Sequence, residues 1–308
     1  MITLPPHLEI HDDRFATLVH PMSTLDEIAT GFTWTEGPVW FGDHDCLLFS
    51  DIPSQRILRW SEGEGVSVFR SGSGFNNGNT RDHLGRLVGC RHGTRDVVRT
   101  EFDGSLTALA DSYEGKRLNS PNDVVVSSDG AVWFTDPTYG IISNFEGYRA
   151  EPEQPARNVY RLSPDGDLKA VASDFVQPNG LCFSPDERVL YIAESGSSHD
   201  DAVPSVIRKF AVDGATLRDL GAFAHITPGL PDGLRCDVLG NVWTSAADGV
   251  QCFAPDGALL GKILVPQIVS NLCFGGRDGH RLFITAKTSV YRVFVDVRGA
   301  EPWTRGAA

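Results

Sequence analysis

The sequence lacks a long apolar run, a paired-cysteine motif and an excess of basic residues. No stretch of the 308 residues approaches 18 apolar positions, and the first ten residues contain no basic segment followed by an apolar one. These absences argue against a membrane span and a secretory signal. The six cysteines never form Cys-x-x-Cys and sit in apolar runs such as Leu181-Cys182-Phe183. We therefore expect free core thiols, not disulfides or zinc ligands, in a cytoplasmic protein.

Basic residues are few relative to acidic ones. The chain has 27 Lys and Arg against 40 Asp and Glu, which gives a formal net charge of -13. Such a charge opposes binding to nucleic acid or to an anionic membrane and favours cations or neutral small molecules. We expect neither nucleic acid nor membrane as a partner, and the sequence leaves the oligomeric state open. Long helical periodicity is also missing.

What the sequence does contain is a repeat, seen most clearly in residues 117–140. Each copy has a polar lead residue, often before Gly, then an apolar strand, a turn with Asp or Gly, and a second apolar strand. Successive lead residues are 41, 45, 57, 53 and 38 positions apart. The six lead residues are Glu36, Asn77, Asn122, Asn179, Asp232 and Ser270.

A third apolar run follows each pair, and a Gly-containing turn and a fourth run follow most of these. Four short strands per unit of roughly 40 to 50 residues predict an all-β, six-bladed β-propeller with four-stranded antiparallel blades. We place the propeller, as one domain, at residues 25–298, between an N-terminal extension (1–24) and a C-terminal tail (299–308). Residues 25–34 could supply the outer strand of the last blade and close the ring, because an open array would expose sheet edges.

Residues 139–157 are too irregular for a strand and too long for a plain turn. Long loops in compact folds are usually functional or disordered. The tyrosines of this segment and Phe145 suggest a lid over one face of the propeller.

The lead residues should meet at one mouth of the central channel, because the innermost strands of all blades point the same way. The set contains two carboxylates, three carboxamides and a hydroxyl, with no thiolate or imidazole. Oxygen donors suit a hard cation such as Ca²⁺ or Mg²⁺. Any single Asn or Asp before Gly could instead be a turn residue. Glu36 occupies the same slot without a turn preference, which favours the ligand interpretation.

Several motifs resemble the gluconolactonase, senescence-marker-protein (regucalcin) and luciferin-regenerating-enzyme family of six-bladed propellers. The resemblance runs from about residue 25 to 295. It rests on Trp34-Thr-Glu-Gly-Pro-Val-Trp40, Arg117-Leu-Asn-Ser-Pro-Asn-Asp123, Trp133-Phe-Thr-Asp-Pro-Thr-Tyr-Gly140, Gln177-Pro-Asn-Gly-Leu181 and Leu230-Pro-Asp-Gly-Leu234.

This resemblance implies a divalent-metal-dependent lactonase that acts on a sugar lactone such as gluconolactone. It implies one cation, with Ca²⁺ as first choice and Mg²⁺, Mn²⁺ or Zn²⁺ as alternatives, held by Glu36, Asn122, Asn179 and Asp232. The cation would polarise the lactone carbonyl while Asp232 acts as base for the attacking water. His92 could share the role of base.

Substrate contacts are a separate set of predictions. Animal members carry a substrate-contacting Arg two residues before the Asn of the third repeat, where this chain has Ser120, and the nearest Arg is Arg117. Other candidates for holding substrate hydroxyls lie near strand ends. The predicted substrate-binding residues are Asn77, His92, Arg117, Asn119, Asp136 and Tyr139.

Two other functions fit the same pattern. Related propellers use a similar metal cradle for phosphoester or phosphofluoridate hydrolysis, and many propellers are non-catalytic binding modules. A scaffold would not need an oxygen cluster of this kind. Ser195 lacks the flanking pattern of a nucleophile elbow, which argues against serine hydrolysis.

Overall fold

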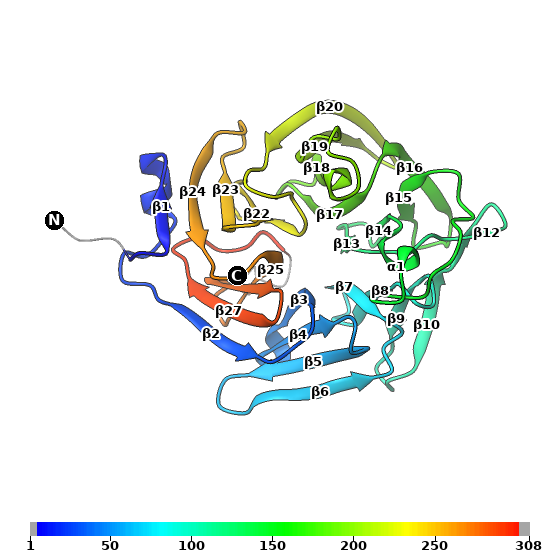
Figure 1. Cartoon of the computed structure of the whole chain (residues 1–308), viewed down its shortest axis with the longest axis horizontal. Coiled ribbons are helices and arrows are strands. Elements are labelled where there is room, and N and C mark those ends of the chain that lie inside the picture. The colour runs from blue at the N-terminus through cyan, green and yellow to red at the C-terminus, as the bar shows by residue number, and fades with distance from the viewer. Residues whose placement is uncertain (1–4, 302–308) are drawn as a thin grey trace.

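The computed structural model describes residues 5–301, which form a ring of six β-sheets around a central axis (Figure 1). Each sheet contains four antiparallel strands, and one of them gains a fifth strand from near the N-terminus. The only α-helix in the described residues is the single turn α1 (Tyr139–Ile142). The predicted six-bladed propeller is therefore confirmed.

The first three blades are built from consecutive strands. Blade one contains β3 (Thr35–Phe41), β4 (Cys46–Asp51), β5 (Arg56–Ser61) and β6 (Gly65–Ser71). Blade two contains β7 (Asn76–Arg81), β8 (Leu87–Arg91), β9 (Asp96–Thr100) and β10 (Leu106–Ala110). A separate hairpin, β11 (Ser112–Tyr113) with β12 (Lys116–Arg117), precedes blade three. Blade three contains β13 (Val124–Val126), β14 (Val132–Asp136), β15 (Arg157–Leu162) and β16 (Leu168–Phe175).

The remaining blades follow the same order until the ring closes. Blade four contains β17 (Pro178–Phe183), β18 (Val189–Glu194), β19 (Val206–Asp213) and β20 (Thr216–His225). Blade five contains β21 (Leu234–Cys236), β22 (Val242–Ala246), β23 (Gly249–Phe253) and β24 (Leu259–Leu264), with β1 (Leu8–Ile10) added beside β24. Blade six contains β25 (Val269–Gly275), β26 (Arg281–Ala286), β27 (Ser289–Phe294) and β2 (Leu25–Thr30).

Ring closure joins the two ends of the chain in blade six. Strand β2 pairs antiparallel with β27, with Leu25 opposite Val293 and Thr30 opposite Ser289. The inner strand β25 then packs beside β3 of blade one. The prediction that residues after position 24 supply the outer strand of the last blade is confirmed.

The turn between the first two strands of a blade explains why Gly and Trp recur in the repeat. In blade five the N–H of Gly240 donates to the carbonyl of Asp237, and Gly240 has φ +84°, a conformation that favours glycine. The indole N–H of Trp243 donates to the Asp237 carboxylate at 2.9 Å. In blade three the indole of Trp133 bonds in the same way to the hydroxyl of Ser127. The recurring Gly and Trp thus fix the turn to the strand that follows it.

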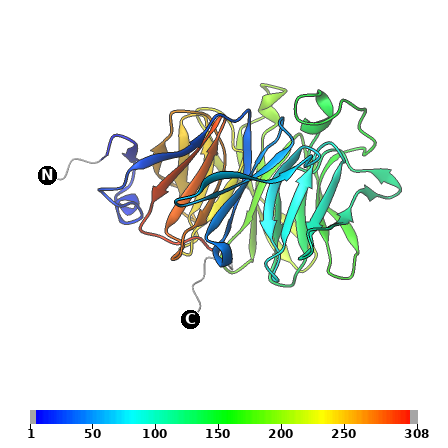
Figure 2. The same ribbon diagram turned by 90° about the horizontal axis from the view of Figure 1, so that it is seen from below.

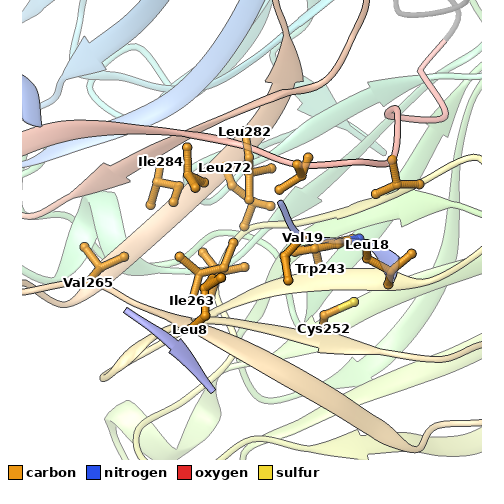
Figure 3. Close-up of a cluster of buried hydrophobic side chains, with 14 of the residues drawn as sticks. Leu8, Leu18, Val19, Trp243, Cys252, Ile263, Val265, Leu272, Leu282 and Ile284 are labelled. Atoms are coloured by element: carbon orange, nitrogen blue, oxygen red, sulfur yellow. The ribbon is translucent and has the colours of Figure 1, made fainter. Parts of the chain in front are cut away.

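The N-terminal residues pack against the ring. Strand β1 pairs with β24, and the 3-10 turn at Asp13–Thr17 buries Phe15 beside Trp243, with ring centroids 5.8 Å apart. Figure 3 shows Leu8, Leu18 and Val19 in one cluster with Trp243 and strand residues of blades five and six. Burial of such side chains contributes roughly 25 cal/mol per Å² of apolar surface. Of the predicted extension 1–24, residues 1–4 lie outside the described residues.

The described C-terminal residues pack against blade five. Gly299 forms a bridge with Asp237, and the N–H of Ala300 donates to the carbonyl of Cys236. Glu301 reaches the guanidinium of Arg235, with Nε and Oε1 3.4 Å apart. Positions 302–308 of the predicted tail are outside the described part.

All six cysteines are buried and free, as predicted. No helix within residues 5–301 is long and apolar enough to cross a bilayer. Figure 2 shows the ring from its edge, with the green helical turn α1 raised on one face. That face carries the candidate site.

Candidate functional site

Five of the six lead residues line one cavity at the mouth of the channel. The cavity has a volume of about 270 Å³. Its polar wall includes Glu36, Asn77, Asn122, Asn179 and Asp232, which come from blades one to five. The sixth lead residue, Ser270, uses its hydroxyl to donate to the carbonyl of Thr35. The predicted convergence is thus seen for five positions.

Close contacts between blades hold these lead residues in place. The N–H of Gly180, directly after Asn179, donates to the carbonyl of Asp232 in the next blade at 3.0 Å. The N–H of Gly78 donates to the carbonyl of Asn122 at 2.8 Å. A Cβ atom at either glycine would collide with that carbonyl. The glycine after the lead residue therefore allows close approach of two blades, and does not mark a turn as the alternative interpretation held.

Of the two lead carboxylates, Glu36 is buried and Asp232 is half-buried, and acidic groups lie near both. One oxygen of Glu36 accepts from the N–H of Gly37 at 2.7 Å and from the amide of Asn271 at 3.1 Å. Burial raises the pKa of Glu36 to about 8, and the charge of Asp123 adds to the shift. Burial also raises the pKa of Asp232 well above its ordinary value, with further contributions from Glu36, Asp123 and Glu146. Both carboxyl groups would be stabilised in their charged form by a nearby cation.

The amide groups supply oxygen atoms that the protein itself does not use. The Oδ1 atoms of Asn179 and Asn77 are buried and have no hydrogen-bond partner, although both side chains line the cavity. Asn122 is fixed by its backbone N–H, which donates to the carbonyl of Thr135 at 2.9 Å. Buried acceptors without protein partners are uncommon, and these two are available to a ligand, an ion or a water molecule.

This donor set fits a hard divalent cation. Within residues 5–301, no three His, Cys, Asp or Glu side chains cluster in a way that could hold a metal ion. A cation in this cavity would therefore depend on amide oxygens beside the two carboxylates. Carboxylate and amide oxygens are the donors that Ca²⁺ prefers, and Mg²⁺ also takes oxygen ligands.

The loop 139–157 supplies one side of the cavity. Tyr139 lines it and shares a hydrogen bond of 3.0 Å between its hydroxyl and that of Ser198. Glu146 lines it as well, and burial raises the pKa of this carboxyl group to about 7. Phe145 points to solvent, whereas Tyr148 packs edge-on against Phe75 at 5.1 Å. The segment thus forms a wall of the cavity through Tyr139 and Glu146.

Three predicted substrate contacts are placed elsewhere by the structure. Arg117 lies on the exposed hairpin β11–β12, and its guanidinium donates to the carbonyl of Thr94. The carboxylate of Asp136 accepts from the backbone N–H groups of Asn119 and Ser120, both at 2.8 Å. Burial raises the pKa of Asp136 to about 7. Neither Arg117, Asn119 nor Asp136 is among the described residues that line the cavity.

These three residues instead organise the stretch 117–140. The amide of Asn119 donates to the carbonyls of Asp136 and Ala156, which lie just before and at the end of the long loop, and so ties the two together. The hydrogen bonds of Asn119 and Asp136 give both side chains a structural role in this stretch. His92 also lies behind the cavity wall, because it is fully buried and absent from the described lining.

Glu146 is the site residue that the sequence did not reveal. It stands alone between Phe145 and Gly147 in an irregular loop, outside the repeat. The one feature of the sequence near Glu146 that bears on its position is the pair Gly140 and Gly147. These glycines pack together, because a Cβ at Gly147 would collide with the carbonyl of Gly140. That contact folds the loop back over α1 and turns Glu146 toward the cavity.

Comparison with known proteins shows which family this chain resembles. Residues 34–288 match the family described as SMP-30/Gluconolactonase/LRE-like region. The chain belongs to this family. The matched region of this SMP-30/gluconolactonase/LRE-like protein contains all five lead residues of the cavity and Glu146.

Individual members of the SMP-30/gluconolactonase/LRE-like family are similar over most of their length. A gluconolactonase from Zymomonas mobilis is 36% identical over 305 residues, which cover 91% of this chain and 83% of that protein. A pentonolactonase from Haloferax volcanii is 29% identical over 276 residues, covering 86% and 85%. The solved structure of a gluconolactonase from Xanthomonas campestris has a TM-score of 0.88 and 39% identity, and covers 94% of both chains.

Proposed function

We propose that this protein hydrolyses a sugar lactone to its hydroxy acid with the help of one divalent cation. The observation that carries the proposal is the convergence of two carboxylates and three carboxamides from five blades on one cavity. Relatives named gluconolactonase and pentonolactonase support the substrate class. Glu36, Asn122, Asn179 and Asp232 are the proposed cation-binding residues, with Ca²⁺ as first choice and Mg²⁺, Mn²⁺ or Zn²⁺ as alternatives.

Such a cation, when bound, supplies a Lewis acid for the lactone carbonyl group. The charge of the cation also favours the ionised forms of Glu36 and Asp232, which burial otherwise disfavours. A cation bound between these two residues would therefore offset the free-energy cost of ionising them.

Asp232 is the proposed proton acceptor. Its N–H donates to the hydroxyl of Ser245 at 2.8 Å and its carbonyl accepts from Gly180, so the backbone that carries the carboxylate is held on both sides. In its ionised form the carboxylate of Asp232 can take a proton from a water molecule at one carboxylate oxygen. Tyr139, Glu146 and Trp34 line the same cavity as Asp232.

Lactone hydrolysis after chelation tests this proposal. Acid release from D-glucono-1,5-lactone and from pentonolactones is measured by pH-stat, first after treatment with a chelator and then after separate re-addition of Ca²⁺, Mg²⁺, Mn²⁺ and Zn²⁺. We expect loss of activity on chelation and recovery with at least one ion. Activity that is indifferent to chelation would contradict the cation-dependent mechanism, and hydrolysis of phosphoesters instead of lactones would contradict the substrate class.

The variant Asp232→Asn separates the charge of this residue from its shape. We expect a loss of kcat of about a hundredfold or more, in the range for a general base. The matched control is Asp165→Asn, which removes one negative charge from an exposed turn that does not line the cavity. A variant Asp232→Asn that hydrolyses lactones at the parent rate would show that Asp232 is not the base.

A further inference from the structure

A buried histidine joins the cavity wall to the loop above it. His92 is fully buried, and its Nδ1 lies 3.0 Å from the carbonyl oxygen of Glu146. A carbonyl oxygen only accepts hydrogen bonds, so Nδ1 must carry a proton. Gly140 packs directly on the ring, because a Cβ there would collide with His92. The ring is thus enclosed by the loop that follows β14.

The other ring nitrogen fixes the orientation of Asn77. Burial lowers the pKa of His92 to about 4, so the ring is neutral near pH 7 and carries only the Nδ1 proton. Nε2 is therefore an acceptor. It lies 3.2 Å from Nδ2 of Asn77, and the amide must present its N–H group to the ring. The Oδ1 atom of Asn77 is consequently turned away from His92.

This orientation leaves an unused acceptor at the cavity. Asn77 is 4% exposed, its Oδ1 has no partner, and its side chain lines the cavity together with Glu146. A buried acceptor without a donor destabilises the protein unless a bound molecule supplies one. A hydroxyl group on the substrate is such a donor. A lactone ring without hydroxyl substituents has none to offer.

We propose that His92 is a positioning residue that aims Asn77 Oδ1 into the cavity as the acceptor for a substrate hydroxyl group, and that holds Glu146 beside it. The site consequently selects polyhydroxylated lactones over unsubstituted ones. This inference rests on the proposed function, because it names the substrate class of the same cavity. It assigns Asn77 to the substrate and not to the cation.

The first test compares two lactones that share a six-membered ring. Gluconolactone carries hydroxyl groups and δ-valerolactone does not. We expect Asn77→Ala to lower kcat/KM for gluconolactone about tenfold, the effect of one lost hydrogen bond, and to change that for δ-valerolactone less than about twofold. Calorimetric Ca²⁺ binding should be unchanged in this variant. Equal losses on both lactones, or loss of Ca²⁺ binding, would overturn the assignment.

The second test separates the two hydrogen bonds of the histidine. The variant His92→Asn keeps a donor near the Nδ1 position for the Glu146 carbonyl but has no atom to reach Asn77. We expect a selective loss for gluconolactone of about fivefold, because the Asn77 amide can then rotate. The matched control His44→Asn changes an exposed histidine in the turn between β3 and β4 and should leave both lactones unaffected.

A spectroscopic readout keeps the inference testable if variants fold poorly. In wild-type protein labelled with ¹⁵N-histidine, the ring of His92 should show a protonated Nδ1 and an unprotonated Nε2 at pH 7. A protonated Nε2 would overturn the inference whatever the kinetics. If wild-type protein hydrolyses neither lactone, the proposed function fails and the substrate role of Asn77 fails with it, whereas loss of selectivity alone overturns only this inference.

Discussion

The carbonyl oxygen of Asp232 accepts a 3.0 Å hydrogen bond from the backbone N–H of Gly180 in the neighbouring blade. Gly180 follows Asn179 directly, so one backbone contact sets the relative position of two proposed cation ligands. Blades two and three share the same contact, between Gly78 and the carbonyl of Asn122. Cation binding should therefore depend on residues that never touch the ion.

A substitution at Gly180 tests this dependence. In Gly180→Ala the new Cβ would collide with the carbonyl of Asp232, and the two blades must move apart. We expect the free energy of unfolding to fall by about 1–3 kcal/mol, as in other overpacked sites, with weaker Ca²⁺ binding. The control Gly42→Ala places its Cβ 3.7 Å from the indole nitrogen of Trp40, an ordinary contact. Urea unfolding and calorimetry measure both effects, and equal behaviour of the two variants would contradict the packing argument.

Removing one lead carboxylate should have opposite effects on stability with and without the cation. In Glu36→Gln the cost of burying an ionisable carboxyl group is removed, together with its repulsion with Asp232 and Asp123, so the chelated protein should unfold at a higher temperature. Cation affinity should fall about tenfold or more, which corresponds to about 1.4 kcal/mol. Thermal unfolding without Ca²⁺ measures the change in stability, and the rise in Tm on adding Ca²⁺ reports the change in cation affinity. A Ca²⁺-induced rise in Tm as large as that of the wild type would show that Glu36 is not a ligand.

His92 should make the protein sensitive to mild acid. Its pKa falls to about 4 in the folded protein, against 6.5 for an exposed histidine. The unfolded chain therefore binds more protons between these values, and this contribution to stability is lost as the pH falls from 6.5 towards 4. The maximum loss is about 3 kcal/mol.

The difference between wild type and His92→Asn isolates this effect. Carboxyl groups with raised pKa values, such as Asp136, act with the opposite sign in the same pH range and are present in both proteins. We expect the difference in unfolding free energy between the two proteins to shrink as the pH is lowered from 7 to 4. A difference that is constant with pH would contradict the neutral, buried state of the ring.

The N-terminal residues should contribute to the stability of the whole ring. Phe15 is fully buried against Trp243, although it precedes β2, where the predicted propeller begins. We expect Phe15→Ala to cost about 3–5 kcal/mol, as other buried Phe truncations do. Phe102→Ala, at a position that is 78% exposed, is the matched control and should cost almost nothing. Similar unfolding midpoints for the two variants would show that the extension is dispensable.

The sequence predicted those parts of the molecule that depend on repetition. Glu36, Asn179 and Asp232 could be placed in one cavity because each occupies the same position in a repeated unit, and a closed ring must bring such positions together. Strand β2 could be assigned to the last blade because an open ring would expose an edge. Both inferences use the topology of the ring and need no contact between particular side chains.

The remaining features depend on contacts that the sequence pattern does not encode. Glu146 reaches the cavity only because Gly140 and Gly147 pack together within an irregular loop. Asp136 and Asn119 carry the polar groups of a binding site, yet their hydrogen bonds are to backbone atoms of the segments around β14. Sequence spacing does not distinguish a polar group that binds a ligand from one that holds a loop.

The pairing of β2 with β27 also determines when the ring can be completed. Thr30 and Ser289, whose hydroxyl groups are 2.8 Å apart, are separated by 259 residues of chain. At a synthesis rate of roughly 5–20 residues per second, strand β2 leaves the ribosome on the order of 10 to 50 s before its partner exists. During that interval an unpaired strand is available to other chains and to chaperones. Nascent protein is thus most exposed to misassembly before the last blade is translated.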